Sequence, residues 1–135
     1  MKHINVVAAV ICHEGKVFAS QRGYGAYKDG WEFPGGKIEK GETPQEAAKR
    51  ELKEEFHDKV QIGSQLGETV SYEYDFGIVK LTVFFAKLLT NNFDLVAHSE
   101  VEWLSADEVQ KLNWVPADAP LVKELARTNF RDIKF

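Results

Sequence analysis

Residues 35–58 read GGKIEKGETPQEAAKRELKEEFHD, a pair of glycines followed by a loop and a predicted helix. The glycine pair allows backbone conformations that other residues resist, and it is predicted to form a turn. Thr43 offers a side-chain oxygen at the N-cap, and Pro44 suits the first helical position, where its missing N–H is not needed. Glu46 completes a capping box with Thr43. Good helix formers continue to Phe56, so a helix is predicted to begin at Pro44 and run to that residue.

Three carboxylates of this predicted helix fall on one face. At about 100° per residue, Glu55 lies about 40° from Glu51, and Glu54 lies about 60° from it on the other side. An apolar stripe suited to packing on a core lies beside them and consists of Ala48, Leu52 and Phe56. Like charges at these spacings repel each other, and a hard divalent cation such as Mg²⁺ would relieve the repulsion by binding their oxygens. A solvated acidic face is the alternative interpretation.

The composition is that of an ordinary globular protein. The chain has 135 residues, 44% apolar and 28% charged, which predicts one domain over residues 1–135. The formal net charge of −4 provides no basic field for a nucleic-acid polymer. Cys12 is the one cysteine, so it forms no intramolecular disulfide, and a reducing cytoplasm fits the chain. The apolar run near the N-terminus is too short to span a membrane, and no signal peptide is visible.

Predicted strands and turns make up most of the chain outside residues 35–58. Stretches rich in β-branched and aromatic residues predict strands at residues 4–12, 16–22, 60–66, 69–74, 78–89 and 100–104. Ser105 is predicted to cap a short helix through Leu112, and Asp118 to cap a last helix to about Thr128. This order of elements predicts an α+β fold, an α/β/α sandwich with a mixed central sheet.

The spacing within residues 36–55 resembles the signature of the Nudix hydrolases. The matching pattern is Gly36-x5-Glu42-x7-Arg50-Glu51-Leu52-x-Glu54-Glu55. The resemblance implies the Nudix fold, in which a mixed sheet lies between helices and the motif forms a loop–helix–loop. The chain departs from the family where His57 and Asp58 replace the usual glycine and aliphatic residue. Histidine tolerates a left-handed turn better than most residues, so we expect a small loss of stability there.

The resemblance also implies roles for individual residues of the motif. Glu51, Glu54 and Glu55 would hold Mg²⁺, or Mn²⁺ in its place, and would act as the catalytic carboxylates. The backbone carbonyl of Gly36 would add a further ligand. Arg50 would hold Glu51 in one rotamer through bidentate hydrogen bonds, the alternative being an ordinary surface arginine. A bound divalent ion would neutralise a polyphosphate, polarise a phosphoryl oxygen and lower the pKa of a bound water.

Charged residues outside the helix are further candidates for the site. Glu100 lies in residues 97–103, AHSEVEW, which resemble a second acidic stretch found in many members of the family. Glu100 could bind a second metal ion or act as the general base, a role that stays open between it and Glu51. Arg22 and Lys37 are candidates for phosphate contacts. Solvated side chains without a role are the alternative in each case.

Four further segments are similar to the branch of the family that contains MutT and the bacterial CTP pyrophosphohydrolases. They are VVAAVI at residues 6–11, QR at 21–22, WEFPGGK at 31–37 and PADAP at 116–120. This resemblance extends over about residues 4–128 and implies cleavage of a nucleoside triphosphate to a monophosphate and pyrophosphate. CTP, dCTP and modified or oxidised nucleotides are the candidate substrates, which implies a role in sanitation of the nucleotide pool.

The base-binding residues are predicted from side-chain chemistry. Asp118 matches the CTP-cleaving members, and an ionised carboxylate would accept a hydrogen bond from the exocyclic amine of cytosine or from the N–H edge of guanine. Alternatively, Asp118 only caps the last helix. Phe33 and Tyr72 could stack on a base, with packing in the core or on the surface as the alternative.

Two other functions stay open at this point. The first is a Nudix pyrophosphatase acting on a nucleoside diphosphate derivative such as ADP-ribose, which is disfavoured because no distinctive proline follows the motif by about 15 residues. The second is a non-catalytic nucleotide-binding module, which is disfavoured because the acidic residues of the motif are retained. The expected partner is a small-molecule nucleotide, with no nucleic-acid polymer and no membrane, and we expect a monomer or a homodimer.

Overall fold

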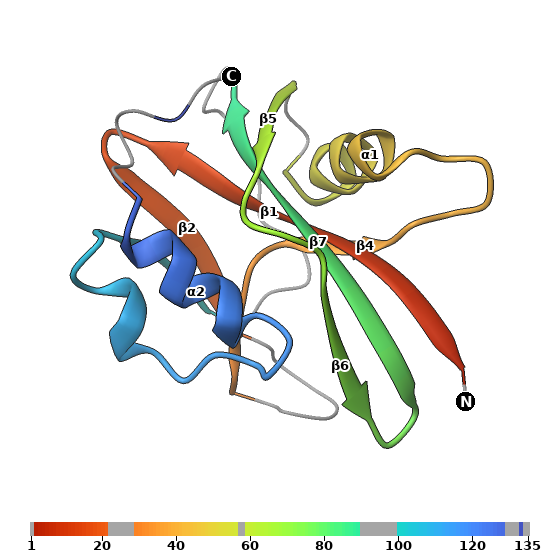
Figure 1. Ribbon diagram of the computed structural model, residues 1–135. Helices are drawn as coiled ribbons and strands as arrows, with labels where there is room; N and C mark the ends of the chain where they lie inside the picture. The colour runs from red at the N-terminus through yellow and green to blue at the C-terminus, as the bar shows by residue number, and fades with distance from the viewer. Residues whose placement is uncertain (1, 22–28, 57–58, 90–99, 129–132, 134–135) are drawn as a thin grey trace.

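The structure is a computed structural model that describes residues 2–21, 29–56, 59–89, 100–128 and 133, with the backbone alone for residues 100 and 101. The helices and strands in chain order (Figure 1) are β1 (His3–His13), β2 (Lys16–Gln21), β3 (Trp31–Glu32), β4 (Gly35–Lys37), α1 (Pro44–Phe56), β5 (Val60–Gln65), β6 (Val70–Tyr74), β7 (Gly77–Leu88), β8 (Glu100–Leu104), the 3₁₀ helix η1 (Val109–Lys111) and α2 (Ala119–Ala126). In the described part of the chain, no helix is long and apolar enough to cross a membrane.

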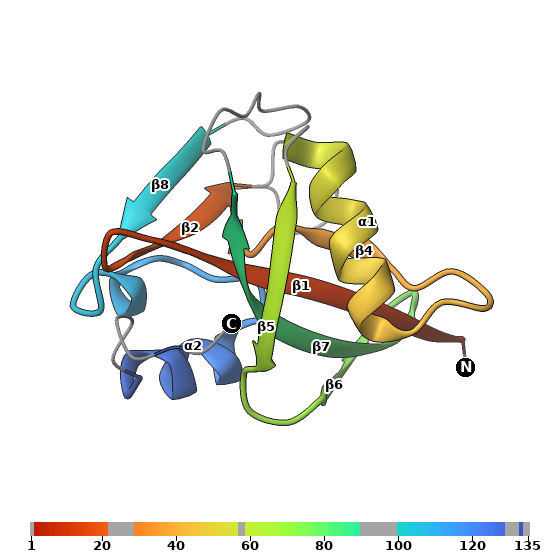
Figure 2. The same ribbon diagram turned by 90° about the horizontal axis from the view of Figure 1, so that it is seen from above.

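A mixed sheet lies between the two α-helices (Figures 1 and 2). Its centre is the parallel pair β1 and β7, in register from His3 opposite Ile78 to Ile11 opposite Ala86. β2 and β4 pair with β1, and β5 and β6 pair with β7, all in antiparallel orientation. β3 and β8 extend the sheet from β2. These pairings and the helix on each face confirm the predicted α+β sandwich with a mixed sheet.

β1 supplies the core on both faces of the sheet because its side chains alternate between them. Val7, Ala9 and Ile11 pack in the clusters that include α1. Ala8 and Val10 pack in the cluster that includes α2 and the segment leading into it. A strand buried on both faces reads as a continuous apolar run, which is the pattern seen between Val7 and Ile11.

α1 begins and packs as its sequence predicts. The N–H of Glu46 donates to Oγ1 of Thr43 over 3.1 Å, and the N–H of Thr43 donates to Oε1 of Glu46 over 2.9 Å, which confirms the capping box. The buried face consists of Ala47, Ala48, Leu52 and Phe56. Full burial of Leu52 and of Phe56 stabilises the fold by roughly 1.5–3 kcal/mol each. This face fixes the helix to the sheet and directs the acidic face toward β4.

Two elements differ from the sequence predictions. The glycine pair forms strand β4 against β1 instead of a turn, and Gly35 is required there because a Cβ would collide with the backbone carbonyl of Val7. The helix predicted from Ser105 to Leu112 is reduced to the single 3₁₀ turn η1. In that segment the Glu108 carboxylate accepts hydrogen bonds from the N–H and the hydroxyl of Ser105, which closes a turn but does not extend a helix.

Candidate active site at the carboxylate cluster and the adjoining cleft

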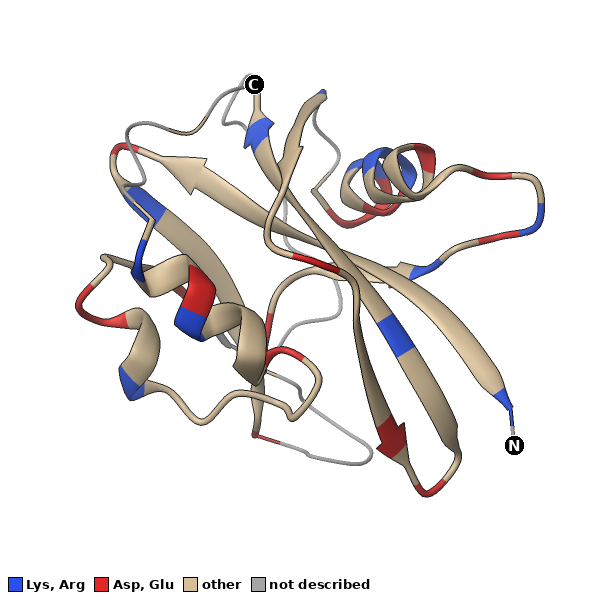
Figure 3. Cartoon of the chain, viewed as in Figure 1, with Lys and Arg blue, Asp and Glu red and all other residues tan. Residues whose placement is uncertain are grey.

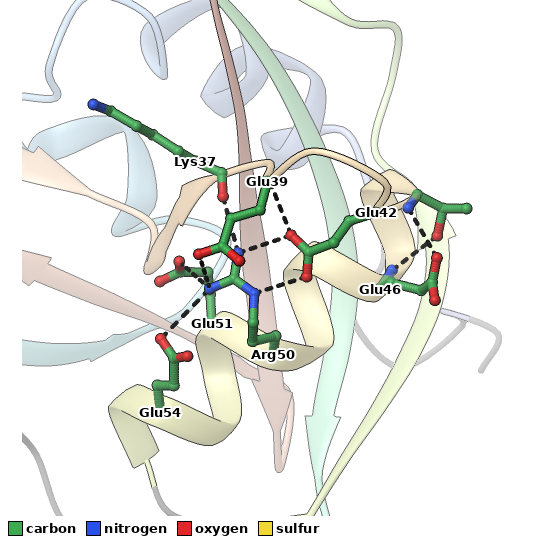
Figure 4. Close-up of polar contacts among 8 residues, drawn as sticks. Lys37, Glu39, Glu42, Glu46, Arg50, Glu51 and Glu54 are labelled. Carbon is green, nitrogen blue, oxygen red and sulfur yellow. Dashed lines mark hydrogen bonds and ion pairs between the residues drawn. The ribbon is translucent and has the colours of Figure 1, made fainter.

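Arg50 lies at the centre of the polar contacts within residues 36–55, which we call the acidic motif (Figure 4). Its Nε and Nη2 atoms donate to the two oxygens of Glu42 over 2.7 and 2.9 Å. Its Nη1 atom donates to Oε1 of Glu51 over 2.8 Å, and its Nη2 atom also donates to the carbonyl of Lys37 over 3.0 Å. The bidentate pairing predicted for Glu51 is therefore made with Glu42, and Glu51 receives one hydrogen bond. The guanidinium thus ties the loop after β4 to the acidic face of α1.

Two more carboxylates stand around the same guanidinium. Oε2 of Glu54 lies 3.5 Å from Nη1 of Arg50, and Oε1 of Glu39 lies 3.8 Å from it. Figure 3 shows acidic positions gathered on α1 and on the loop that leads into it. The positive charge of Arg50 offsets part of the repulsion among these carboxylates. The sequence analysis had assigned that effect to a bound divalent cation.

Hydrogen bonds and burial shift the pKa values of the cluster in opposite directions. Hydrogen bonds to Glu42 and then to Glu51 raise the pKa of Arg50 above its ordinary value. The same bond from Arg50, followed by one from the N–H of Glu39, lowers the pKa of Glu42. Burial raises the pKa of Glu51, against the opposing hydrogen bond from Arg50. Glu42 is therefore a fixed anion that holds the arginine, whereas Glu51 is a carboxylate with increased affinity for a proton.

Gly36 brings the backbone of β4 into contact with Glu51. A Cβ at this position would lie 2.5 Å from both carboxylate oxygens of Glu51. A glycine is therefore needed for close approach between the strand and the helix rather than for an unusual φ angle, because the φ of Gly36 is not positive. The main chain at Gly36 and the carboxylate of Glu51 thus stand side by side.

A cleft of about 600 Å³ opens beside this contact, a size that suits a small-molecule ligand. Its apolar lining comes largely from β1 and β7 and includes Ile4, Val6, Val79 and Leu81. The segment between β3 and β4 contributes another wall, and Tyr74 and Phe76 contribute a third. Its described charged lining residues are Lys2, Glu32, Lys37, Glu55 and Asp118. An apolar cleft with a few charged groups at its walls is the usual form of a ligand site.

Asp118 occupies a buried position in the cleft. The residue is 5% exposed, and its Oδ2 atom accepts a hydrogen bond from the N–H of Phe33 over 3.0 Å. It stands at the N-cap of α2 but makes no side-chain capping bond, so capping is not its role. Next to it, the N–H of Ala117 donates to the hydroxyl of Tyr74 over 3.0 Å. The segment before α2 is thereby attached both to β6 and to the segment between β3 and β4.

The structure brings together several of the predicted site residues. The cleft is lined by Phe33, Gly36, Lys37, Glu55 and Asp118. Tyr72 does not line it, and the neighbouring Tyr74 does. Predictions for Arg22, His57, Asp58 and the side chain of Glu100 lie outside the described residues.

Besides Tyr74, the sequence analysis missed Glu42, Lys2 and Phe76. Glu42 belongs to the quoted pattern, yet only the fold reveals that its carboxylate binds Arg50 in bidentate fashion. Lys2 and Phe76 line the cleft because the start of β1 lies beside the turn between β6 and β7, where the N–H of Ile78 donates to the carbonyl of Lys2. No local pattern marks these two residues, since their proximity depends on the pairing of β1 with β7.

The oxygen donors of the motif fit a hard divalent cation. Glu51 lies against Gly36, Oε2 of Glu55 is buried, and Glu54 is an exposed side chain beside Arg50. Carboxylate and carbonyl oxygens are the ligands that Mg²⁺ and Mn²⁺ prefer. In the ranges that the structure describes, no three His, Cys, Asp or Glu side chains are close enough together to hold a metal ion. The donor types fit a divalent cation, and the side chain of Glu54 is 61% exposed.

A family model described as the NUDIX domain matches residues 1–125. This chain therefore belongs to the Nudix hydrolase family, which confirms the resemblance inferred from the motif. It is 32% identical over 124 residues to the CTP pyrophosphohydrolase of Escherichia coli K12, covering 91% of each chain. It is 34% identical over 127 residues to the putative 8-oxo-dGTP diphosphatase 2 of Mycobacterium tuberculosis H37Rv, covering 91% of this chain and 88% of that protein.

A solved structure agrees with the same assignment. The solution structure of the DNA mismatch repair protein MutT, a Nudix hydrolase from methicillin-resistant Staphylococcus aureus 252, is 41% identical. The similarity covers 93% of this chain and 96% of that chain, with a TM-score of 0.75. The fold described above is thus that of a MutT-type Nudix hydrolase.

Proposed function

We propose that this chain hydrolyses a nucleoside triphosphate to a nucleoside monophosphate and pyrophosphate, with Mg²⁺ bound by the carboxylates of α1. The observation that carries this proposal is the position of Gly36 and Glu55, which belong to the acidic motif and also line the cleft that contains Asp118. A nucleotide in the cleft could therefore place its phosphates at the carboxylates and its base toward Asp118.

The metal end of the site would be built from Glu51, Glu54, Glu55 and the carbonyl of Gly36. A divalent ion bound there would neutralise the polyphosphate and lower the pKa of a coordinated water. Arg50 fixes Oε1 of Glu51, so that the orientation of this carboxylate is set before substrate binds. The ammonium group of Lys37 extends away from Arg50 (Figure 4), and this residue lines the cleft, where it would contact a phosphate. Glu51 and Glu100 are both retained as candidates for the general base.

The base end of the site favours a substrate with a hydrogen-bond donor on its base edge. An ionised Asp118 can only accept hydrogen bonds, and one of its oxygens already accepts the N–H of Phe33. Cytosine presents its exocyclic amine, and guanine presents an N–H edge. The names of the two relatives above, a CTP pyrophosphohydrolase and an 8-oxo-dGTP diphosphatase, support the same two classes of base. We propose CTP, dCTP or an oxidised guanine nucleotide as the substrate.

A panel of nucleotides with Mg²⁺ tests this proposal through the identity of the products. Pyrophosphate and a monophosphate released from CTP, dCTP or 8-oxo-dGTP would support it. AMP and ribose phosphate released from ADP-ribose, with the triphosphates left intact, would assign the chain to diphosphate derivatives instead. Tight nucleotide binding without turnover of any compound would indicate a binding module. The Glu55→Gln variant, purified in the same way, is the control for contaminating phosphatases.

A further inference from the structure

The turn between β6 and β7 presents an exposed aromatic side chain to the cleft. Phe76 is 55% exposed and is one of the residues that line the cleft. Phe33 also lines the cleft, but it is 4% exposed and packs on Trp114, with ring centroids 4.6 Å apart. Phe76 therefore has far more apolar surface to lose to a ligand than Phe33, the residue that the sequence had suggested for stacking.

Neighbouring residues hold Phe76 in position. Its ring stacks on that of Tyr74, with centroids 5.2 Å apart and planes 7° from parallel, and the hydroxyl of Tyr74 is bound by the N–H of Ala117. On the other side of the turn, the N–H of Ile78 donates to the carbonyl of Lys2 over 2.8 Å. An aromatic ring supported in this way loses little conformational freedom when a ligand stacks on it.

We propose that Phe76 stacks on the nucleobase of the substrate and provides the affinity that distinguishes a nucleotide from an inorganic polyphosphate. This inference rests on the proposed function, because the phosphates must occupy the end of the cleft at Gly36 and Glu55. The apolar side chains of Ile4 and Val79 line the cleft with Phe76 and would cover the remaining surface of the base. Stacking tolerates any base, because every base has a π-face, so Phe76 sets affinity whereas Asp118 selects the hydrogen-bonding edge.

Isothermal titration in the presence of Mg²⁺ tests this role without turnover. The probes are the α,β-methylene analogues of CTP and GTP, and inorganic triphosphate, which has no base. Phe76→Ala should weaken binding of both analogues at least about fivefold, since loss of one base–aromatic stack has that effect or more. Phe76→Trp should keep the affinity within about twofold, and inorganic triphosphate should bind all variants equally. Leu89→Ala is the matched control, because Leu89 is 51% exposed and does not line the cleft.

The outcomes separate this inference from the proposed function. If Phe76→Ala leaves the affinity of both analogues unchanged while inorganic triphosphate still binds, the stacking role is wrong and the proposed function stands. If Tyr72→Ala weakens binding more than Phe76→Ala does, Tyr72 is the stacking residue and the inference is overturned. An unchanged affinity with a lower sedimentation coefficient for Phe76→Ala would assign the ring to a contact between two copies, which also overturns it. Failure of the wild-type protein to bind any of the probes would contradict both statements.

Discussion

Replacement of Gly36 by alanine would place a methyl group against the carboxylate of Glu51. The added Cβ would lie 2.5 Å from each carboxylate oxygen, whereas the optimal separation of two non-bonded heavy atoms is about 3.5 Å. The carboxylate must therefore withdraw by about 1 Å, because the strand is fixed by its pairing with β1 and the side chain is the flexible partner. The backbone itself accepts alanine, since the φ of Gly36 is not positive.

A displacement of this size should reduce kcat/KM about a hundredfold, because misplacement of a catalytic group by 1 Å has an effect of that order. The loss corresponds to roughly 2.7 kcal/mol of the activation barrier. The assay is the initial rate of pyrophosphate release from CTP with Mg²⁺, together with a thermal melt of the same preparation. We expect the melting temperature of Gly36→Ala to stay close to that of the wild type.

Gly41→Ala, in the loop that follows β4, is the matched control. Gly41 has a φ of +89°, and a Cβ there would meet nothing within 4 Å. Alanine at this position should destabilise the fold by about 1 kcal/mol through backbone strain and leave kcat/KM unchanged. If Gly36→Ala keeps the wild-type kcat/KM, the contact between this glycine and Glu51 has no part in catalysis.

Three further predictions concern other contacts of the structure. Arg50→Lys removes the guanidinium that binds both oxygens of Glu42, so kcat should fall at least about tenfold while the circular dichroism spectrum stays unchanged. A lower melting temperature with full kcat would contradict a positioning role for Arg50. Glu108 accepts two hydrogen bonds from Ser105, which lower its pKa below the ordinary value of 4.5, so their contribution to stability is present at neutral pH and is lost as the pH falls through the lowered pKa. The difference in melting temperature between wild type and Glu108→Gln should therefore shrink from neutral pH to about pH 3. A difference that stays constant with pH would refute this coupling. Asp118→Asn keeps an acceptor for the N–H of Phe33 but adds a hydrogen-bond donor, so the preference for CTP over UTP in a competition assay should fall about tenfold. An unchanged preference would show that another group recognises the base.

The fold was predictable where local chemistry and long-range packing agree. The capping box at Thr43 and the apolar stripe through Leu52 and Phe56 act within one helix, so the sequence alone placed α1 correctly. The glycine pair was assigned to a turn because glycine is common in turns, whereas tertiary contact with Val7 makes it a strand. The helix expected after Ser105 failed because a favourable cap cannot extend a segment that closes as a short turn.

The candidate site was predictable where it coincides with the helix motif. The spacing of Glu51, Glu54 and Glu55 places them on one face of α1, and the roles given to them here remain proposals. The interactions of Arg50 with Glu42, and of Asp118 with Phe33, join segments that are distant along the chain. Helical periodicity carries no information about such contacts, because they are set by the path of β4 and of the segment before α2.

The most direct test of the account is the rate of pyrophosphate release from the preferred triphosphate by Glu54→Gln and Glu55→Gln, compared with wild type at saturating Mg²⁺. Glutamine has nearly the same shape but no charge, so each variant should fold and should lose at least about a hundredfold in kcat, or roughly 2.7 kcal/mol of transition-state stabilisation. Glu124→Gln, an exposed site on α2, is the matched control and should keep the wild-type rate. Rates near wild type for both Glu54→Gln and Glu55→Gln would contradict the assignment of the carboxylate cluster as the metal-binding catalytic site.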